Sequence, residues 1–198
     1  MGQYYKPLLI GKHGKYHILY SHDYDNGLKL MEHSYVGNTF VNAARSLLLN
    51  NPMCVAWVGD YSDDPYEDAY SKKLPYEKFM RFYKACWGEK TKHDRPHPMD
   101  YDEQNKGWKL VNHTAKCYVD MDEYNSNAVT WEKWNGKKIP VIVDPLPLLT
   151  ACGNDRGGGD FHEGCVGYSN VGIWAFDMLE FTQTVPDGYE KVTFCFKE

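Results

Sequence analysis

The sequence predicts an α+β fold, in which a mainly antiparallel sheet with two helices packed against it forms a single compact domain over residues 1–198. Two patterns predict this class. β-type segments separated by turns lie on both sides of a central region, and only that region carries apolar residues at helical spacing. The aromatic content of 15% also suits a β-rich fold, because Tyr and Trp pack well on a pleated sheet. A chain of 198 residues is long enough for one well-buried core.

The chain begins with a predicted three-stranded meander. Residues 3–10 and 16–21 are β-type segments joined by a glycine-containing turn, which predicts a hairpin. The Asn26-Gly27 pair predicts a second tight turn, because such pairs adopt the positive φ angles that hairpin turns require. A third strand is therefore expected over residues 28–34.

Two helices are predicted next. Asn38 or Thr39 can cap the first, which ends before Pro52. Its apolar residues recur at the helical period, at Phe40, Ala43, Ala44, Leu47 and Leu48. Pro75 suits the first turn of the second helix, and Gly88 suits its end. The apolar face of this helix comprises Phe79, Phe82, Tyr83 and Cys86.

Most of the remaining segments are predicted strands. Residues 89–107 are polar and without periodicity, so we expect a long surface loop there. The apolar run over residues 141–149 is expected to be a buried strand. The further predicted strands are residues 54–58, 108–113, 116–121, 139–143, 171–181 and 190–196.

A glycine-rich loop at residues 153–160, Gly-Asn-Asp-Arg-Gly-Gly-Gly-Asp, is the strongest functional signal. Consecutive backbone N–H groups can form a concave anion-binding site, and the guanidinium of Arg156 would add charge to it. The loop matches neither the P-loop nor the dinucleotide-binding motif, so it indicates a small polar or anionic ligand without naming it. The alternative is a glycine-rich crossover that only packs under its neighbours. The predicted ligand-binding residues are Asn154, Arg156, Gly157, Gly158, Gly159 and Asp160.

Polar residues at the ends of apolar runs suggest acid–base chemistry. His33 or His113 is a candidate general base, and Asp60 or Asp160 is a candidate for orienting it. The alternative for each histidine is a half-buried ring with its hydrogen bonds satisfied. The predicted catalytic residues are His33, Asp60 and His113.

Metal and thiol chemistry have weaker signals. Imidazole and carboxylate side chains suit several transition metals, but no spacing matches a known metal motif, so no metal ligands are predicted and the cofactor stays unknown. Cys152 is the only thiol beside the glycine-rich loop, and nothing in the sequence indicates a lowered pKa for it.

Charge and composition exclude some classes of partner. The net charge of −5 argues against binding to extended nucleic acid, which requires a basic surface. No apolar stretch reaches the roughly 18 residues of a membrane span. Six cysteines without a C-x-x-C pair or a signal peptide indicate reduced thiols and a cytoplasmic protein. The acidic segment 60–68 would suit a basic host protein as partner.

The chain also resembles a family of uncharacterised proteins from bacteriophages and gut-bacterial mobile elements that begin Met-Gly-Gln-Tyr-Tyr and carry a C-terminal glycine-rich loop. The resemblance is carried by residues 1–6, 27–34, 58–61, 110–114, 145–150, 153–160, Trp174 and Asp177. It implies a phage or mobile-element origin and one compact domain. This chain has Asp155 where the family loop has glycine, and the extra carboxylate partly offsets the charge of Arg156.

Together these features predict a phage accessory protein that binds, and in one version degrades, a small nucleotide-like or other polar ligand, in order to counter host nucleotide signalling. Two alternatives stay open. One is a metal-assisted hydrolase that uses His33, Asp60 and His113. The other is a protein–protein inhibitor of a host factor. The oligomeric state is not predicted.

Overall fold

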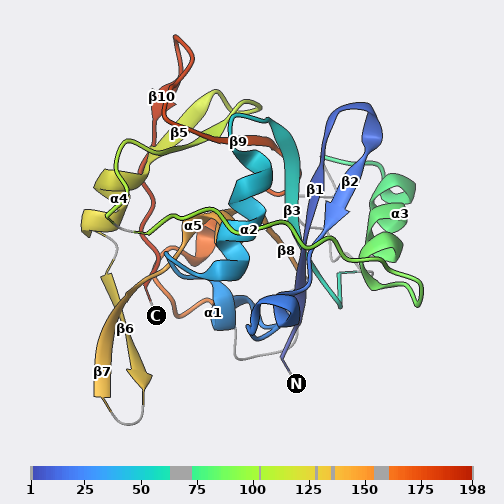
Figure 1. Cartoon of the computed structure of the whole chain (residues 1–198), viewed down its shortest axis with the longest axis horizontal. Helices are drawn as coiled ribbons and strands as arrows, with labels where there is room; N and C mark the ends of the chain where they lie inside the picture. Colours follow the sequence, from blue (N-terminus) through green and yellow to red (C-terminus); the bar gives the residue numbers. More distant parts are fainter. Residues whose placement is uncertain are drawn as a thin grey trace.

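An eight-stranded, mainly antiparallel sheet forms the centre of the fold (Figure 1). The computed structural model describes residues 2–62, 73–102, 104–127, 129–134, 137–153 and 161–197. Within these residues the strand order is β10-β5-β4-β9-β3-β1-β2, with β8 also pairing with β3. The strands of this sheet are β1 (Tyr5–Ile10), β2 (Tyr16–Ile18), β3 (Met53–Gly59), β4 (Lys109–Asn112), β5 (Cys117–Asp120), β8 (Ala151–Cys152), β9 (Met178–Thr182) and β10 (Glu190–Lys191). The α+β prediction is confirmed.

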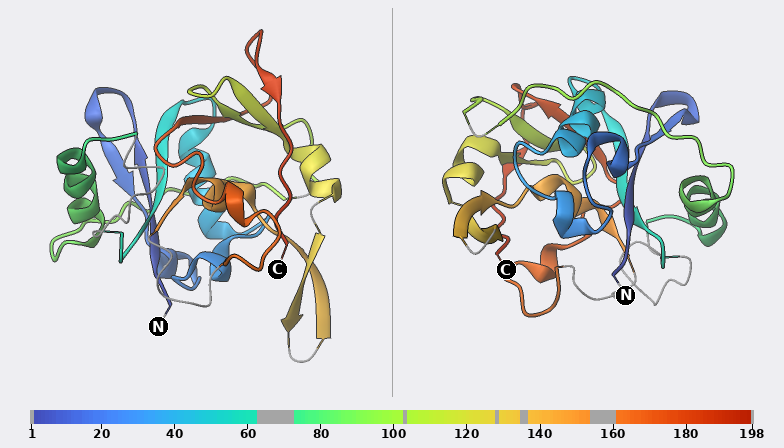
Figure 2. Two further views of the ribbon diagram at one scale, coloured as in Figure 1. Left: turned by 180° about the vertical axis from the view of Figure 1, so that it is seen from behind. Right: turned by 60° about the horizontal axis from the view of Figure 1, so that its bottom comes forward.

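Two hydrophobic clusters cover the two faces of this sheet, because residues along a strand alternate between faces. Val55 and Trp57 of β3 belong to the larger cluster, which packs against α2 (Thr39–Leu48) and α5 (Pro145–Thr150). Ala56 and Val58 belong to the smaller cluster, which packs against α3 (Tyr76–Trp87). Figures 1 and 2 show α3 on the opposite side of β1 and β3 from α2.

The two predicted helices form at the expected places. The Asn38 side chain caps α2 by accepting hydrogen bonds from the backbone N–H groups of Phe40 and Val41, at 2.9 and 3.2 Å. Pro75 precedes α3, and Gly88 follows it and donates its N–H to the Lys84 carbonyl. Both helices therefore begin and end where their capping residues predict.

A buried lysine attaches α3 to the sheet. Lys6 of β1 donates from Nζ to the carbonyl of Cys86 in the last turn of α3, at 3.0 Å. The same ammonium lies 4.3 Å from the centre of the Trp87 ring and 5.3 Å from that of Tyr20. Burial lowers the pKa of Lys6. A cation at the carboxyl end of a helix is favourable, because the last carbonyl groups carry partial negative charge.

The third predicted strand, residues 28–34, is wrong. The chain forms the short helix α1 (Leu30–His33) there. The Glu32 side chain accepts a hydrogen bond from the Lys29 N–H at 3.0 Å, and the Ser34 hydroxyl donates to the Leu30 carbonyl at 2.5 Å. These local side-chain bonds stabilise a helical turn in a segment whose apolar residues also suit a strand.

The predicted buried strand over residues 141–149 is also wrong. β7 (Lys137–Ile142) pairs with β6 (Val129–Trp134) in a separate two-stranded sheet, and the chain then turns into α5. Asp144 caps α5 by accepting from the Leu146 N–H at 2.9 Å, and a proline follows in the first turn, where its missing N–H costs nothing.

Two further strands are shorter than predicted, and one helix was not expected. Residues 171–176 form turns, in which Gly172 and Phe176 have φ angles of 75° and 63°, so that only β9 remains of the predicted strand 171–181. In the segment 190–196 only β10 pairs. The chain between β5 and β6 contains the helix α4 (Met121–Asn127).

The long connection over residues 89–107 contains no helix or strand among its described residues, as predicted. Part of this connection lies in the core, because Tyr101 is only 1% exposed. The Met99 N–H donates to the Asn42 carbonyl at 3.3 Å, and Asn42 Nδ2 donates to the Tyr101 carbonyl at 2.7 Å. The connection is therefore held along α2.

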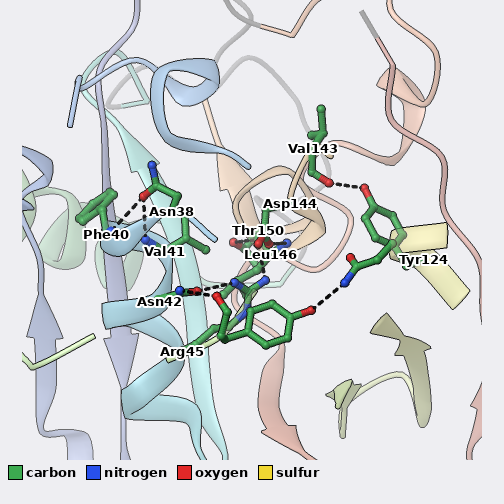
Figure 3. Close-up of polar contacts among 12 residues, drawn as sticks. Asn38, Phe40, Val41, Asn42, Arg45, Tyr124, Val143, Asp144, Leu146 and Thr150 are labelled. Carbon is green, nitrogen blue, oxygen red and sulfur yellow. Dashed lines mark hydrogen bonds and ion pairs between the residues drawn. The ribbon is translucent and has the colours of Figure 1, made fainter. Parts of the chain in front are cut away.

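A buried ion pair links this connection, α2 and α5 (Figure 3). Arg45 Nη2 donates to Asp144 Oδ2, and Arg45 Nη1 donates to Asn42 Oδ1 at 3.0 Å. The guanidinium carbon lies 4.5 Å from the ring centre of Tyr101 and 5.1 Å from that of Phe181. Both charged side chains are excluded from water. The pair therefore replaces part of the lost hydration of both charges, while Arg45 Nε has no hydrogen-bond partner among the described residues.

Replacing Arg45 by methionine tests the importance of this pair. The substitution leaves the Asp144 carboxylate buried without its cation, so we expect a loss of about 3–5 kcal/mol in the free energy of unfolding, measured in urea. Adding Asp144→Asn should restore part of the loss, because asparagine is uncharged and still caps α5.

Lys191→Met is the control, because it removes the exposed ion pair between Lys191 Nζ and Glu123 Oε2 and should have a far smaller effect. Equal losses in Arg45→Met and Lys191→Met would contradict the role assigned to the buried pair.

Candidate functional site

Two parallel strands end side by side at one edge of the main sheet. β3 and β8 pair in parallel, with Trp57 opposite Ala151 and Val58 opposite Cys152. Gly59 and Gly153 are therefore the next residues on the two strands. The carboxyl ends of adjacent parallel strands are places where α/β proteins commonly bind ligands, because the loops that follow them diverge.

We call Gln3, Tyr5, Gly59, Asp60 and Gly153 the strand-end site. Gln3 is only 1% exposed. Its Oε1 accepts a hydrogen bond from the Tyr5 hydroxyl at 2.7 Å, whereas its Nε2 has no hydrogen-bond partner among the residues that the structure describes. A buried, unpaired N–H donor costs about 1–3 kcal/mol, so this amide is the most unusual polar group of the site.

Both glycines make room for this amide. A Cβ on Gly59 would lie 2.4 Å from Gln3 Nε2. A Cβ on Gly153 would lie 2.6 Å from both Gln3 Oε1 and the Tyr5 hydroxyl. A side chain at either position would therefore displace the Gln3 amide.

Asp60 is held firmly at the same edge. Its Oδ1 accepts from the Tyr4 N–H at 3.0 Å, and its own N–H donates to the Tyr4 carbonyl at 3.0 Å. The Tyr83 hydroxyl of α3 donates to the Asp60 carbonyl at 2.7 Å. The structure thus brings Asp60 close to Gly153, the first residue of the glycine-rich loop.

The predicted ligand-binding residues Asn154, Arg156, Gly157, Gly158, Gly159 and Asp160 lie outside the described residues. Their chain position places them directly after Gly153.

His33 lies in the core below this edge and has no nitrogen available for proton abstraction. Its ring is fully buried, Nδ1 donates to the Gly27 carbonyl at 3.0 Å, and Nε2 accepts from Trp57 Nε1 at 3.0 Å. Burial lowers the pKa of His33 to about 4, although the bond to Gly27 opposes that shift. This arrangement matches the alternative of a satisfied core histidine, and it does not support the predicted catalytic role of His33.

His113 lies at the far end of β3 from Asp60. Asn112 of β4 pairs with Leu179, which pairs with Met53 at the start of β3, and Asp60 follows the end of that strand. At about 3.3 Å per residue the separation is roughly 20 Å. The three predicted catalytic residues therefore do not share one site.

His113 instead has partners that sequence reasoning did not find. Its Nε2 lies 2.8 Å from Glu180 Oε2, and its Nδ1 lies 3.0 Å from the Tyr189 hydroxyl. The only sequence signal for Glu180 is its position between Leu179 and Phe181, which places its side chain on the other face of β9.

The thiols and the possible metal ligands form no second candidate site among the described residues. All six cysteines are free, and burial raises the pKa of Cys152 well above its ordinary value, which leaves it protonated and unreactive. In the part of the chain that the structure describes, no three His, Cys, Asp or Glu side chains form a group that could hold a metal ion.

Comparisons with protein-family models, with curated proteins and with solved structures found no match for this chain. A search of the described helices for one long and apolar enough to cross a bilayer also found none.

The buried His33 predicts how stability depends on pH. Its folded-state pKa of about 4 is below the ordinary value of 6.5, so the unfolded chain takes up a proton that the folded chain excludes. The free energy of unfolding should therefore fall as pH drops from about 6.5 to 4, by up to about 3 kcal/mol from this residue. Urea unfolding at a series of pH values measures it.

His33→Gln removes the titrating group, so its stability should decline less steeply over the same interval. His97→Gln, which changes an exposed histidine, is the matched control and should follow the wild-type curve. Parallel curves for His33→Gln and the wild type would show that burial of His33 does not carry the pH dependence.

Proposed function

We propose that this chain binds a small polar ligand, nucleotide-like in class, at the strand-end site. One observation carries the proposal. The Gln3 amide is almost completely buried beside the ends of two parallel strands, and its Nε2 has no hydrogen-bond partner in the described part of the chain. A ligand oxygen that accepts from this N–H would remove the cost of leaving it unpaired.

The chemistry of the surrounding groups indicates the type of ligand. Gln3 Nε2 is a donor, which favours carbonyl, hydroxyl or phosphate oxygen as its partner. In the sequence Arg156 follows Gly153 closely, and a guanidinium favours the same oxygen-rich, anionic groups. The phosphate and hydroxyl oxygens of a nucleotide fit both preferences.

The ligand reaches Gln3 only when the site opens, because the amide is closed to solvent in this structure. Binding and opening are therefore coupled, and ligand affinity is reduced by the fraction of molecules that are closed. The proposed function is binding alone, because His33 is saturated with hydrogen bonds and His113 lies at the other end of β3.

The resemblance to phage and mobile-element proteins extends this proposal to a biological role. A cytoplasmic phage protein that binds a nucleotide would lower the free concentration of a host signalling nucleotide. This extension rests on the resemblance alone, whereas the ligand site rests on the geometry of Gln3 and its two glycine neighbours.

Native mass spectrometry of the protein purified from bacteria without added ligand tests the proposal first. The wild type should retain a mass in the nucleotide range. Gln3→Glu replaces the N–H donor by an acceptor of the same shape, and Gly153→Ala displaces the amide, so both should lose that mass. Arg156→Ala should lose it as well.

Gln104→Glu provides the matched control, since it makes the same change of charge at an exposed glutamine and should keep the ligand. Thermal unfolding of each variant shows whether it is folded. The proposal fails if the wild type carries no ligand and its unfolding temperature does not respond to nucleoside monophosphates, diphosphates or cyclic nucleotides.

A further inference from the structure

Three side chains from distant parts of the chain form a hydrogen-bonded series at the opposite end of the sheet from the strand-end site. His113 follows β4, Glu180 lies on β9 and Tyr189 precedes β10. Glu180 Oε2 lies 2.8 Å from His113 Nε2, and the Tyr189 hydroxyl lies 3.0 Å from His113 Nδ1. The imidazole is therefore held between a carboxylate and a phenol.

The carboxylate determines which nitrogen carries the proton. An ionised Glu180 only accepts hydrogen bonds, so in the neutral imidazole Nε2 carries the hydrogen and donates it. The lone pair then lies on Nδ1, directed at the Tyr189 hydroxyl. A hydroxyl within hydrogen-bond reach of a base that is oriented by a third group is the arrangement that activates nucleophiles in acyl-transfer enzymes.

The backbone holds each member in place. The His113 N–H donates to the Met178 carbonyl at 2.8 Å, which keeps His113 beside β9. Tyr189 follows Gly188, whose φ of 79° closes the turn that begins at Pro186. The next residue donates its N–H to the Lys116 carbonyl at 3.1 Å, so that Tyr189 is fixed from both sides.

The burial of the series exceeds that of a surface ion pair. The side chain of His113 is 19% exposed and that of Glu180 is 15% exposed. The rings of His113 and Tyr189 meet edge-on, with centres 5.7 Å apart and an interplanar angle of 74°. In the pair between His17 Nδ1 and Asp94 Oδ2 the histidine is similarly enclosed, at 22% exposed, but the carboxylate is 53% exposed, so the two pairs differ in the burial of the carboxylate.

We propose that Tyr189 is a nucleophilic hydroxyl that accepts an acyl group, with His113 as its general base and Glu180 as the positioning residue. Tyr189 Oη attacks the carbonyl carbon of an activated acyl donor and forms the O–C bond, while its proton passes to His113 Nδ1. The bond to the leaving group then breaks, and that group takes the proton from His113. The product is an O-acyl tyrosine, and nothing is oxidised or reduced.

The carboxylate of the series favours an uncharged donor. Phosphoryl transfer requires cations that neutralise the transferring group, whereas the group facing His113 here is the anionic Glu180. The transferred acyl group carries no charge of its own, so it does not require such cations. This proposal concerns a different end of the sheet from the strand-end site and does not depend on the proposed ligand.

Acetylation of the whole protein by N-acetylimidazole, followed by peptide mass spectrometry, tests the assignment. Tyr189 should be acetylated about tenfold faster or more than Tyr16 and Tyr76, although these two are 40% and 56% exposed. In His113→Gln the rate at Tyr189 should fall by a factor of about 100, the scale of general-base assistance. Glu180→Gln should lower it less, because glutamine still accepts the hydrogen bond.

His17→Gln is the matched control, because it removes a histidine paired with a carboxylate but with no phenol on the same ring in the bonds described. It should leave the rate at Tyr189 unchanged. Urea unfolding of each variant separates loss of activation from loss of structure, and Glu180→Gln serves if His113→Gln does not fold. The proposal is overturned if Tyr189 reacts no faster than Tyr76, or if folded variants at positions 113 and 180 keep the wild-type rate.

Discussion

The buried ion pair between Arg45 and Asp144 is the interaction on which most of the fold depends. Two charges without water are tolerable only if each finds a partner, and here the partners come from α2 and from the start of α5. The same guanidinium lies against the rings of Tyr101 and Phe181, which belong to the long connection and to β9. One side chain therefore fixes the relative positions of four segments.

This interaction also explains why a long irregular connection can be part of the core. The backbone around Tyr101 makes no helix or strand bonds, so its polar groups need other partners. Asn42 supplies one of them from α2, and it also accepts from Arg45. The connection is therefore held by polar contacts in addition to the packing of Tyr101 in the hydrophobic core.

Local patterns in the sequence predict α2, α3, β3 and the first hairpin. The two helices carry helical periodicity and capping residues, and the strands are apolar segments bounded by turn residues. Local patterns failed at residues 28–34 and 141–149, where a few apolar residues fit either a strand or a helix and short-range side-chain bonds decide. The pairing of Arg45 with Asp144 joins residues 99 positions apart. Nothing near either residue in the sequence indicates it.

In the candidate site, too, local sequence indicates single features, whereas long-range pairing determines which of them lie together. Asp60 and the glycine-rich loop each stand out as polar ends of apolar runs, but their proximity follows from the parallel pairing of β3 with the two-residue strand β8. A strand that short has no periodicity to detect. His33 and His113 have the same residue type and different roles, because one is enclosed by the core and the other lies between Glu180 and Tyr189.

The position of β3 has a consequence for how the chain is made. This strand pairs with β1 near the beginning of the chain, and with β8 and β9 near residues 151 and 178. During synthesis β1, β2 and β3 can form an early hairpin-based unit, but the edge that awaits β9 stays open until most of the chain has left the ribosome. An unpaired strand edge of that kind is a target for other strands, so we expect the nascent chain to be more prone to aggregation than the finished protein.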